Sequence, residues 1–223
     1  MPLRKTPIAT NEIYHVINRG VNQQPIFGNK YDYERISQLI FYYQFANLPL
    51  RFSFLKRLTK GERGKLFENL KKSSRLVTLL AYCLMPNHFH LLIRQEQDNG
   101  ISKFLANLQN SYTKYYNSKH KRTGHLFQGQ FKAIRIEKEE QLLHTSRYIH
   151  LNPYTAYVVK TADNLKEYPW SSLIQYVSKD KKGICETNLI LNKFFTKNKY
   201  LKFVLDQKDY QRQLDKIKHV LLE

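Results

Sequence analysis

The stretch "RLVTLLAYCLMPNHFHLLIR", residues 75–94, predicts the centre of the fold. Its first half is a nearly unbroken apolar run with the length of a buried strand. "PN" interrupts this run and "HFHLLIR" resumes it, so we expect two antiparallel strands joined by a tight turn. Side chains alternate between the faces of a strand, so His88 and His90 share one face while Phe89 points to the other. The hairpin therefore places two imidazoles together on one face of a sheet.

Two imidazoles on one strand face are close enough to bind one metal ion. The alternative is two ordinary half-buried histidines, each with a backbone hydrogen-bond partner. That alternative is the usual one for a single histidine and is weaker for a pair on the same face. The spacing alone leaves both interpretations open.

The segments around this hairpin predict further strands and helices. Residues 12–18, "EIYHVIN", have the β-branched and aromatic composition of a strand. Apolar side chains recur at helical spacing from Tyr31 to Pro49, again from Gly100, and in the segment that Pro153 is expected to end. A short strand is expected within "TGHLFQGQFKAIRIE". This order predicts an α+β fold, with a ferredoxin-like antiparallel sheet and helices on one face.

We expect one main domain at residues 1–172, followed by a helical C-terminal extension at 173–223. Residues 51–75 carry nine basic and two acidic side chains and are interpreted as a basic insertion, either a solvated helical hairpin or a phosphate-binding patch. In the extension, a last helix from about residue 206 is predicted from one apolar stripe, formed by Tyr210, Leu214, Ile217 and Leu221.

The composition points to a polyanionic partner. The 223 residues include 37 Lys and Arg against 18 Asp and Glu, a net charge of +19, together with 16 Tyr and 13 Phe. Such a chain repels itself unless a polyanion is bound, and aromatic rings among cations suit single-stranded nucleic acid. Two distant cysteines give no disulfide framework and no CxxC zinc site. No signal peptide or membrane-length apolar run is recognised, so we expect a cytoplasmic protein without a membrane partner.

The motif "RYIHLNP", residues 147–153, supplies a nucleophile and a further ligand. Tyr148 and Asn152 are four residues apart and therefore share one helix face. The amide oxygen of asparagine suits a hard cation such as Mg²⁺ or Mn²⁺, and tyrosine offers a phenol oxygen. His144 precedes Tyr148 by one turn and would be placed to hold or deprotonate that phenol. A surface histidine is the simpler interpretation of His144, and we favour it.

Four motifs in order, "MPNHFHLLI", "GHLFQGQFK", "SRYIHLNP" and "YPWSS", resemble the IS200-like tyrosine transposases, and above all their REP-associated branch. The resemblance runs from the first strand to about Ser172 and is interrupted by residues 51–75. It implies an enzyme that nicks single-stranded or hairpin DNA through a 5′-phosphotyrosyl intermediate and then rejoins it. It also implies a prokaryotic, nucleoid-associated protein whose partner is DNA with hairpins or palindromic repeats.

The resemblance also assigns roles to residues. His88 and His90 correspond to the family's His-hydrophobic-His metal ligands, Tyr148 to its nucleophile, and Asn152 to the polar residue that completes the metal site. The implied cofactor is Mg²⁺ or Mn²⁺. Some relatives are homodimers whose tyrosine helix comes from the partner and others are monomers, so both arrangements stay open here.

DNA contacts are expected at two places. Asn18 and Arg19, at the end of the first strand, resemble the family's "NRG" motif. Basic residues also cluster around a glycine-containing loop, where they would bind phosphates in a salt-sensitive manner: Lys119, Lys121, Arg122, Lys132 and Arg135. In the same loop, His125 is a further candidate ligand, although a structural role is the interpretation that we favour.

Three other tyrosines compete with Tyr148 as nucleophiles. Tyr112 and Tyr115 are interpreted as helix-packing residues and Tyr116 as a surface or stacking ring, because none is followed by a polar ligand one turn later and then a helix end.

Three alternative functions are kept. The first is a domesticated endonuclease that processes chromosomal hairpins without moving itself. The second is a non-catalytic, basic nucleic-acid-binding protein. The third is a zinc hydrolase, which requires a third His, Asp or Glu ligand and an activated water.

Overall fold

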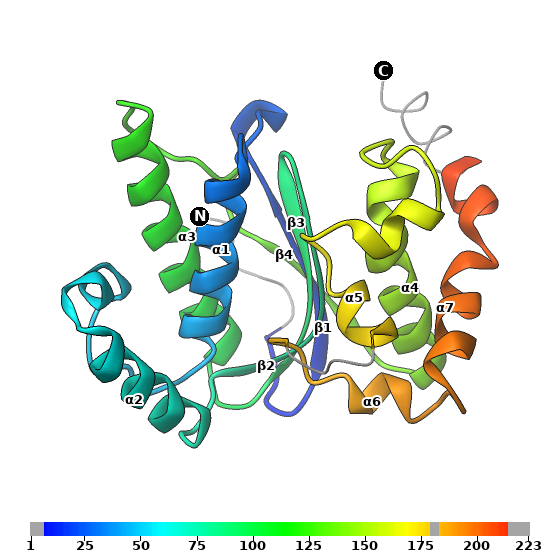
Figure 1. Ribbon diagram of the computed structural model, residues 1–223, viewed down its shortest axis with the longest axis horizontal. Coiled ribbons are helices and arrows are strands. Elements are labelled where there is room, and N and C mark those ends of the chain that lie inside the picture. The colour runs from blue at the N-terminus through cyan, green and yellow to red at the C-terminus, as the bar shows by residue number, and fades with distance from the viewer. Residues whose placement is uncertain (1–6, 179–182, 214–223) are drawn as a thin grey trace.

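The computed structural model describes residues 7–178 and 183–213. Its centre is an antiparallel sheet of four strands in the order β2-β3-β1-β4 (Figure 1). The predicted hairpin is confirmed, since Met85 pairs with His88 across a turn at Pro86 and Asn87. The strands are β1 (Ile13–Arg19), β2 (Val77–Met85), β3 (His88–Gln95) and β4 (Lys132–Ile136).

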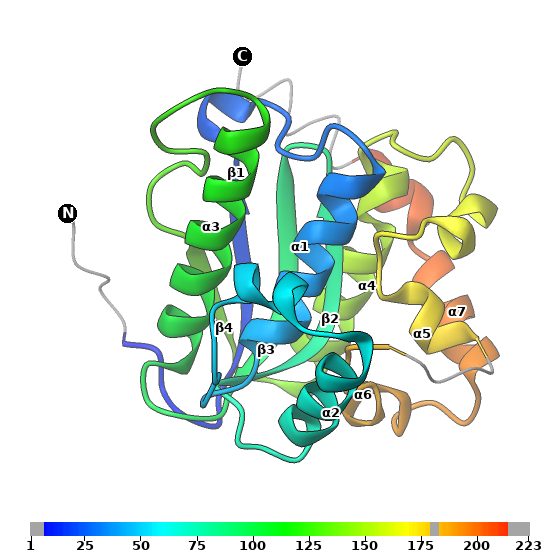
Figure 2. The ribbon, with the colours of Figure 1, turned by 60° about the vertical axis from the view of Figure 1, so that its left-hand side comes forward.

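The α+β class is confirmed, but helices cover both faces of the sheet rather than one (Figures 1 and 2). The cause lies in β2, which is buried at every position, as expected of a continuous apolar run with two covered faces. Leu79 and Leu84 belong to one core, and Leu80 and Cys83 to the other. One layer contains α1 (Lys30–Tyr43) and α3 (Gly100–Lys119), and the other contains α4 (Glu139–Thr155), α5 (Leu173–Val177) and α7 (Lys197–Leu205).

The α1–α3 layer packs an apolar stripe onto the sheet. Ile36 and Ile40 of α1 and Phe104 of α3 are fully buried in the core that contains Phe89. The N-terminus of α1 is capped by Asn29, whose side chain accepts hydrogen bonds from two backbone amides of the first turn. These helices therefore leave the other face of β3, which carries the histidines, to the second layer.

The basic insertion between α1 and β2 is helical. It forms a short 3-10 helix, η2 (Phe52–Arg57), followed by α2 (Lys60–Lys71). Thr59 and Glu62 form a reciprocal capping box at the start of α2. Figure 2 shows this segment beside the end of α1. The expected helical hairpin is thus one 3-10 turn and one α-helix.

In the second layer, α4 continues through Pro153 to Thr155, so the predicted end at the proline is wrong by two residues. Proline lacks only its own N–H, and the next turn is still closed by the Ala156 amide, which donates to the Asn152 carbonyl. Tyr176 of α5 and Tyr200 of α7 are fully buried in the same core as Ile149 of α4. Residues of the C-terminal extension thus share a core with the tyrosine helix.

The tail differs in part from its predicted form. The short α6 (Asn188–Leu191) and α7 precede the predicted last helix, and helical backbone resumes at 208–213. The predicted stripe residues Leu214, Ile217 and Leu221 lie outside the described residues. Two short 3-10 turns, η1 (Val21–Gln23) and η3 (Asp163–Glu167), complete the fold. Across the described part of the chain, no helix combines the length and apolarity needed to cross a membrane.

Candidate active site

The two histidines of β3 share one face of the sheet, as predicted, and α4 packs on that face. The ring centroids of His88 and His90 are 4.9 Å apart, with the ring planes nearly perpendicular. His90 is almost fully buried, and burial, aided by the neighbouring His88 and His15, lowers its pKa well below the usual value. Nδ1 of His88 lies 2.6 Å from the side-chain oxygen of Asn87. His90 is therefore uncharged at neutral pH and keeps a ring-nitrogen lone pair.

His15 of β1 is a third imidazole in this cluster, and no sequence motif pointed to it. Its Nε2 lies 2.9 Å from Nδ1 of His90, and the two rings stack with centroids 5.1 Å apart. Burial lowers the pKa of His15 to about 4. A histidine inside the apolar run "EIYHVIN" was the available signal, but its partner depends on the register between β1 and β3. In that register His15 pairs with Leu92 and Ile17 pairs with His90, so all four side chains share a face.

Tyr148 of α4 lies against this pair. Its ring meets those of His90 and His15 edge-on, with centroid distances of 5.5 and 5.9 Å. Asn152, one turn further along α4, is 4% exposed, and its Nδ2 donates to the Tyr148 carbonyl at 3.3 Å. The Nδ2 atom of Asn152 makes this hydrogen bond. The Oδ1 atom of the same amide is the one suited to bind a cation, and this hydrogen bond does not use it. We name His15, His88, His90, Tyr148 and Asn152 together the histidine–tyrosine cluster.

A buried histidine fixes the position of α4. His150 is fully buried, with Nδ1 2.7 Å from the Tyr200 hydroxyl and Nε2 2.8 Å from Ser172 Oγ. Ser172 Oγ in turn accepts a hydrogen bond from the Tyr82 amide of β2. The motifs "SRYIHLNP" and "YPWSS" are therefore in contact in the fold. Ser172 of the second motif connects His150 of the first motif to β2 through hydrogen bonds.

The donor atoms of this site fit a divalent cation held by mixed nitrogen and oxygen ligands. His88, His90 and Asn152 would offer two imidazoles and one amide oxygen, and the low pKa of His90 keeps it unprotonated. The described residues contain no group of three or more His, Cys, Asp or Glu side chains arranged to hold a metal ion. The third imidazole, His15, faces His90 instead, which does not favour the zinc-hydrolase alternative.

Strand register separates the expected DNA-binding residues into two groups. Arg19 pairs with His88, and Lys132 pairs with Ile17, so both lie on the histidine face. The Nε of Arg19 donates to the side-chain oxygen of Gln128 at 2.5 Å. Asn18 pairs with Phe89 and therefore lies on the opposite face.

The remaining predicted residues have partners that are not members of the histidine–tyrosine cluster. Arg135 pairs with Tyr14 on the opposite face, and its Nη2 forms an ion pair with Glu12 at 2.7 Å. Arg122 donates to the His125 carbonyl in the exposed loop that also holds Lys121.

His144 also has partners outside the cluster. Its Nδ1 lies 2.7 Å from Nη2 of Arg147, and its ring contacts Phe203 of α7 edge-on. Its side chain is about half exposed, so the structure supports the surface interpretation of this residue.

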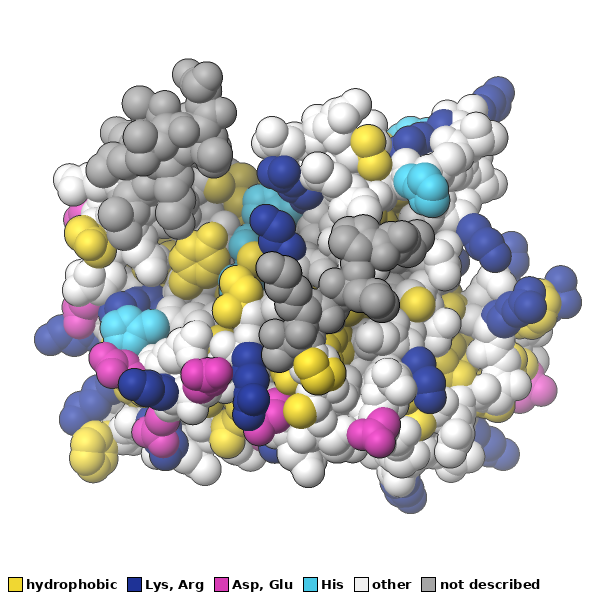
Figure 3. All heavy atoms as spheres, turned by 180° about the vertical axis from the view of Figure 1, so that it is seen from behind, with side chains coloured by type: hydrophobic (Ala, Val, Ile, Leu, Met, Phe, Trp, Pro, Cys, Tyr) yellow, Lys and Arg dark blue, Asp and Glu magenta, His cyan; other side chains and the backbone are white. Residues whose placement is uncertain are grey.

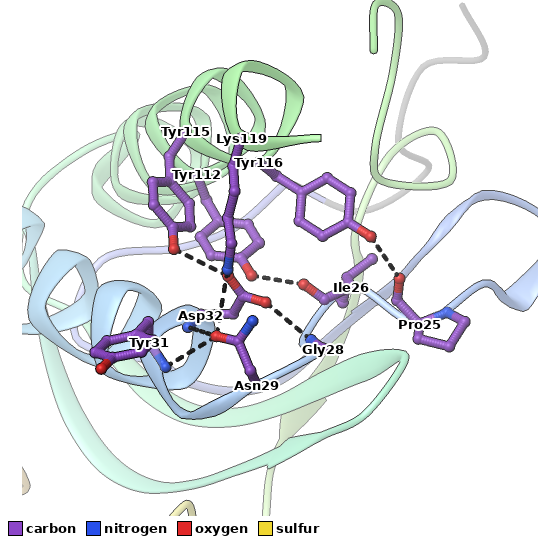
Figure 4. Close-up of polar contacts among 10 residues, drawn as sticks. All are labelled: Pro25, Ile26, Gly28, Asn29, Tyr31, Asp32, Tyr112, Tyr115, Tyr116 and Lys119. Atoms are coloured by element: carbon purple, nitrogen blue, oxygen red, sulfur yellow. Dashed lines mark hydrogen bonds and ion pairs between the residues drawn. The ribbon is translucent and has the colours of Figure 1, made fainter. Parts of the chain in front are cut away.

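The three competing tyrosines of α3 have structural partners (Figure 4). Tyr112 is fully buried, its hydroxyl donates to the Ile26 carbonyl at 2.5 Å, and burial raises its pKa far above the usual value. The Tyr115 hydroxyl donates to Asp32 and that of Tyr116 to the Pro25 carbonyl. These hydroxyls bind α3 to the start of α1, on the side of the sheet away from the histidines.

Lys119 belongs to the same structural group. Its Nζ lies 2.6 Å from Oδ1 of the fully buried Asp32 and 3.2 Å from Asn29 Oδ1 (Figure 4). Burial alone would raise the pKa of Asp32, but hydrogen bonds from Lys119, the Gly28 amide and Tyr115 lower it overall. Lys119 is therefore already paired with a buried carboxylate.

The surface around β4 is basic. In the space-filling view from behind, histidine side chains appear near the centre of the face with Lys and Arg side chains beside them (Figure 3). Positive side chains thus lie beside histidine side chains on this face.

Comparisons with known proteins show the family and the fold of this chain. The family model described as "Transposase IS200 like" matches residues 40–152, about half of the chain, and the match includes both β3 histidines, Tyr148 and Asn152. A solved structure of a REP-associated tyrosine transposase bound to a REP hairpin is similar in fold, with a TM-score of 0.52 and 16% sequence identity. The similarity covers 82% of this chain and 89% of that chain. A search of curated proteins found no match. From the family match, the chain belongs to the IS200-like transposases.

Proposed function

We propose that this transposase is a metal-dependent DNA strand transferase that nicks single-stranded hairpin DNA through a 5′-phosphotyrosyl intermediate and then rejoins it. The observation that carries the proposal is the packing of Tyr148 edge-on against His90 and His15, one turn from Asn152. A candidate nucleophile thereby lies against two unprotonated imidazoles, and an asparagine amide follows it by one helical turn.

The ligand roles follow from the state of each side chain. Burial keeps His90 unprotonated at neutral pH, so a ring-nitrogen lone pair is available to a metal without prior loss of a proton. His15 is positioned to fix the orientation and tautomer of the His90 ring, as an outer partner of a metal-bound histidine does. A divalent cation held by His88, His90 and Asn152 would neutralise charge on the scissile phosphate and favour ionisation of the attacking phenol.

The proposed covalent step belongs to Tyr148. Its phenol oxygen attacks phosphorus, a P–O bond forms to the tyrosine, and the bond from phosphorus to the 3′ oxygen breaks. The departing strand takes up a proton as a 3′-hydroxyl, and the phenol proton is lost to solvent. An incoming 3′-hydroxyl reverses these changes and joins the strands, so no nucleotide cofactor is needed. Tyr148 contacts His90 of its own chain, which supports action in cis.

The proposed partner is DNA with hairpins or palindromic repeats. The net charge of +19 and the placement of Arg19 and Lys132 on the histidine face support a DNA partner. The similar solved transposase was bound to a REP hairpin, which supports testing hairpins first. The same chemistry would serve an autonomous transposase or a domesticated hairpin-processing enzyme.

The test is a covalent-adduct assay. Purified protein is incubated with 3′-labelled single-stranded hairpins, taken from DNA that flanks the gene, and Mn²⁺ or Mg²⁺, and is then run on a denaturing gel. We expect label at the mass of the protein that is lost with EDTA and in Tyr148→Phe. Tyr116→Phe is the matched control, because its hydroxyl only contacts the Pro25 carbonyl, and it should still form the adduct. Cleavage without an adduct would show that water is the nucleophile.

A further inference from the structure

Two adjoining cavities of about 720 and 660 Å³ lie between α1, α3 and the basic insertion. Arg35 of α1, Phe52 and Ser53 of η2, and Tyr115 of α3 line both, so the two cavities form one continuous cleft. We name it the basic cleft. It is made by residues 51–71 closing over the outer surface of two core helices, beside the end of α1 (Figure 2).

The walls of the basic cleft carry an excess of positive charge. Among the residues that the structure describes (7–178 and 183–213), no Asp or Glu lines either cavity. Of the lining cations, Lys119 is paired with Asp32, and the others make no ion pair with a carboxylate in the described part of the chain. The cations are Arg35, Arg51, Lys56, Arg63, Lys114 and Lys119. Low-dielectric walls around charge of one sign concentrate the field, and an anion is the complementary ligand.

Arg35 is the most informative of these residues. Its guanidinium lies over the Phe52 ring at 4.5 Å and the Tyr115 ring at 5.3 Å. Its Nε is buried and has no hydrogen-bond partner among the described residues. Burial of a charge without an anionic partner costs free energy, and planar guanidinium groups are well suited to bind phosphate. Arg35 thus lies near two rings in a cleft where the described residues supply no Asp or Glu.

The α3 wall is a polar stripe. Asn107, Asn110, Ser111, Lys114 and Ser118 line the cleft at helical spacing. This stripe is about 17 Å long at a rise of 1.5 Å per residue. Asparagine, serine and lysine side chains are common donors to phosphate oxygens of DNA. Their extended row suits a polymer backbone better than a single small anion.

The basic cleft is separate from the histidine–tyrosine cluster. It lies outside the α1–α3 layer, which packs on the Phe89 face of the sheet, whereas His88 and His90 occupy the other face. DNA in the cleft would therefore be a part of the substrate remote from the scissile phosphate.

We propose that the basic cleft binds the phosphate backbone of DNA outside the cleavage site, so that residues 51–71 extend the DNA-binding surface around the molecule. This inference rests on the proposed DNA substrate, but not on the tyrosine chemistry. The cations act on phosphates and not on bases, so the contribution is independent of sequence and sensitive to salt.

The test compares two charge-matched double variants. Arg51→Gln with Lys114→Gln removes two exposed cations from the cleft. Lys65→Gln with Lys72→Gln removes two exposed cations in and directly after α2 that line neither cavity. Affinity for a hairpin with long single-stranded flanks is measured over a range of salt concentrations. EDTA and the Tyr148→Phe background are used throughout, so a failure of the proposed chemistry cannot affect the result.

The cleft variant should bind about 10-fold or more weakly at low salt, and its slope of log affinity against log salt should fall by about 2, near 1 for each phosphate that is no longer neutralised. The control variant should change far less. Trimming the flanks and then the stem of the probe distinguishes which part of the DNA the cleft binds. Equal slopes in the two variants would overturn the inference.

A second measurement avoids substitutions in the cleft altogether. Lysine acylation of the native protein is followed by mass spectrometry with and without the same DNA. Lys56 and Lys114 should be protected by DNA, whereas Lys65 should not. Unchanged labelling of Lys56 and Lys114 in a saturated complex would also overturn the inference.

Discussion

Nε2 of His15 lies 2.9 Å from Nδ1 of His90, joining two buried imidazoles from strands that are far apart in the sequence. Both are uncharged at neutral pH, since burial lowers the pKa of each. In such a pair one nitrogen donates and the other accepts. If His90 donates from Nδ1, its Nε2 keeps the lone pair that a metal requires.

His15→Ala is therefore expected to weaken Mn²⁺ binding about 10- to 100-fold, the usual effect of losing an outer hydrogen-bond partner of a metal ligand. His15→Gln, whose side-chain amide can restore a hydrogen bond to His90, should recover part of the affinity. Titration of Mn²⁺ followed by electron paramagnetic resonance measures this without DNA. His144→Ala is the control, because that residue contacts Arg147 and Phe203. Equal Mn²⁺ affinity in wild type and His15→Ala would remove the positioning role of His15.

The two faces of β4 provide a second prediction. Lys132 lies on the histidine face, while Arg135 lies on the other face and is paired with Glu12. Lys132→Gln should lower the salt slope of hairpin binding by about 1, as expected when one phosphate is no longer neutralised. Arg135→Gln should leave that slope nearly unchanged. A larger effect at Arg135 would mean that the cleaved strand does not follow the histidine face.

Lys119 should contribute to stability through Asp32. In Lys119→Met the fully buried Asp32 carboxylate loses its ion pair. We expect the free energy of unfolding to fall by about 2 kcal/mol, less than for a fully buried pair because Lys119 is partly exposed. Urea unfolding, followed by fluorescence of the single Trp170, measures the change. Lys121→Met should have almost no effect, and similar decreases in both variants would contradict the ion-pair assignment.

His150 should make stability depend on pH. Burial lowers its pKa to about 3, and the neighbouring Tyr176 and Tyr200 remain neutral because burial raises their pKa values. The unfolded chain binds a proton near pH 6.5 and the folded protein does not, so stability is lost as pH falls below that value. Between pH 7 and pH 5 this one group should cost about 2 kcal/mol.

The matched variant for this prediction is His150→Gln. It should show a shallower decline in the free energy of unfolding between pH 7 and pH 5, whatever its stability at pH 7. His144→Gln, at an exposed position, should keep the wild-type pH profile. An unchanged decline in His150→Gln would show that His150 is not the group that takes up the proton.

Local patterns in the sequence were enough to predict the hairpin and the shared face of His88 and His90. Both depend only on an apolar run, a turn and strand alternation. The position of Tyr148 and Asn152 on one helix face follows equally from helical periodicity. Their approach to the histidines had to be inferred from family resemblance, because it depends on how α4 packs against the sheet.

Features set by long-range pairing could not be predicted. The hydrogen bond between His15 and His90 spans 75 positions and depends on strand register. The apolar run of β2 is consistent with burial on both faces. It does not say which helices cover the second face, so the second helical layer could not be predicted. Lys119 and Arg135 were predicted as DNA contacts from local charge, and their acidic partners Asp32 and Glu12 lie far away in the sequence.

Adduct mapping decides whether Tyr148 is the nucleophile, on which the proposed function depends. The protein is incubated with hairpin DNA and Mn²⁺, the complex is digested with nuclease and protease, and the modified peptide is sequenced by tandem mass spectrometry. We expect a nucleotide joined through its 5′ phosphate to Tyr148, within "RYIHLNP". A nucleotide on Tyr115 or Tyr116, or cleaved DNA with no modified peptide, would contradict the proposed role of Tyr148.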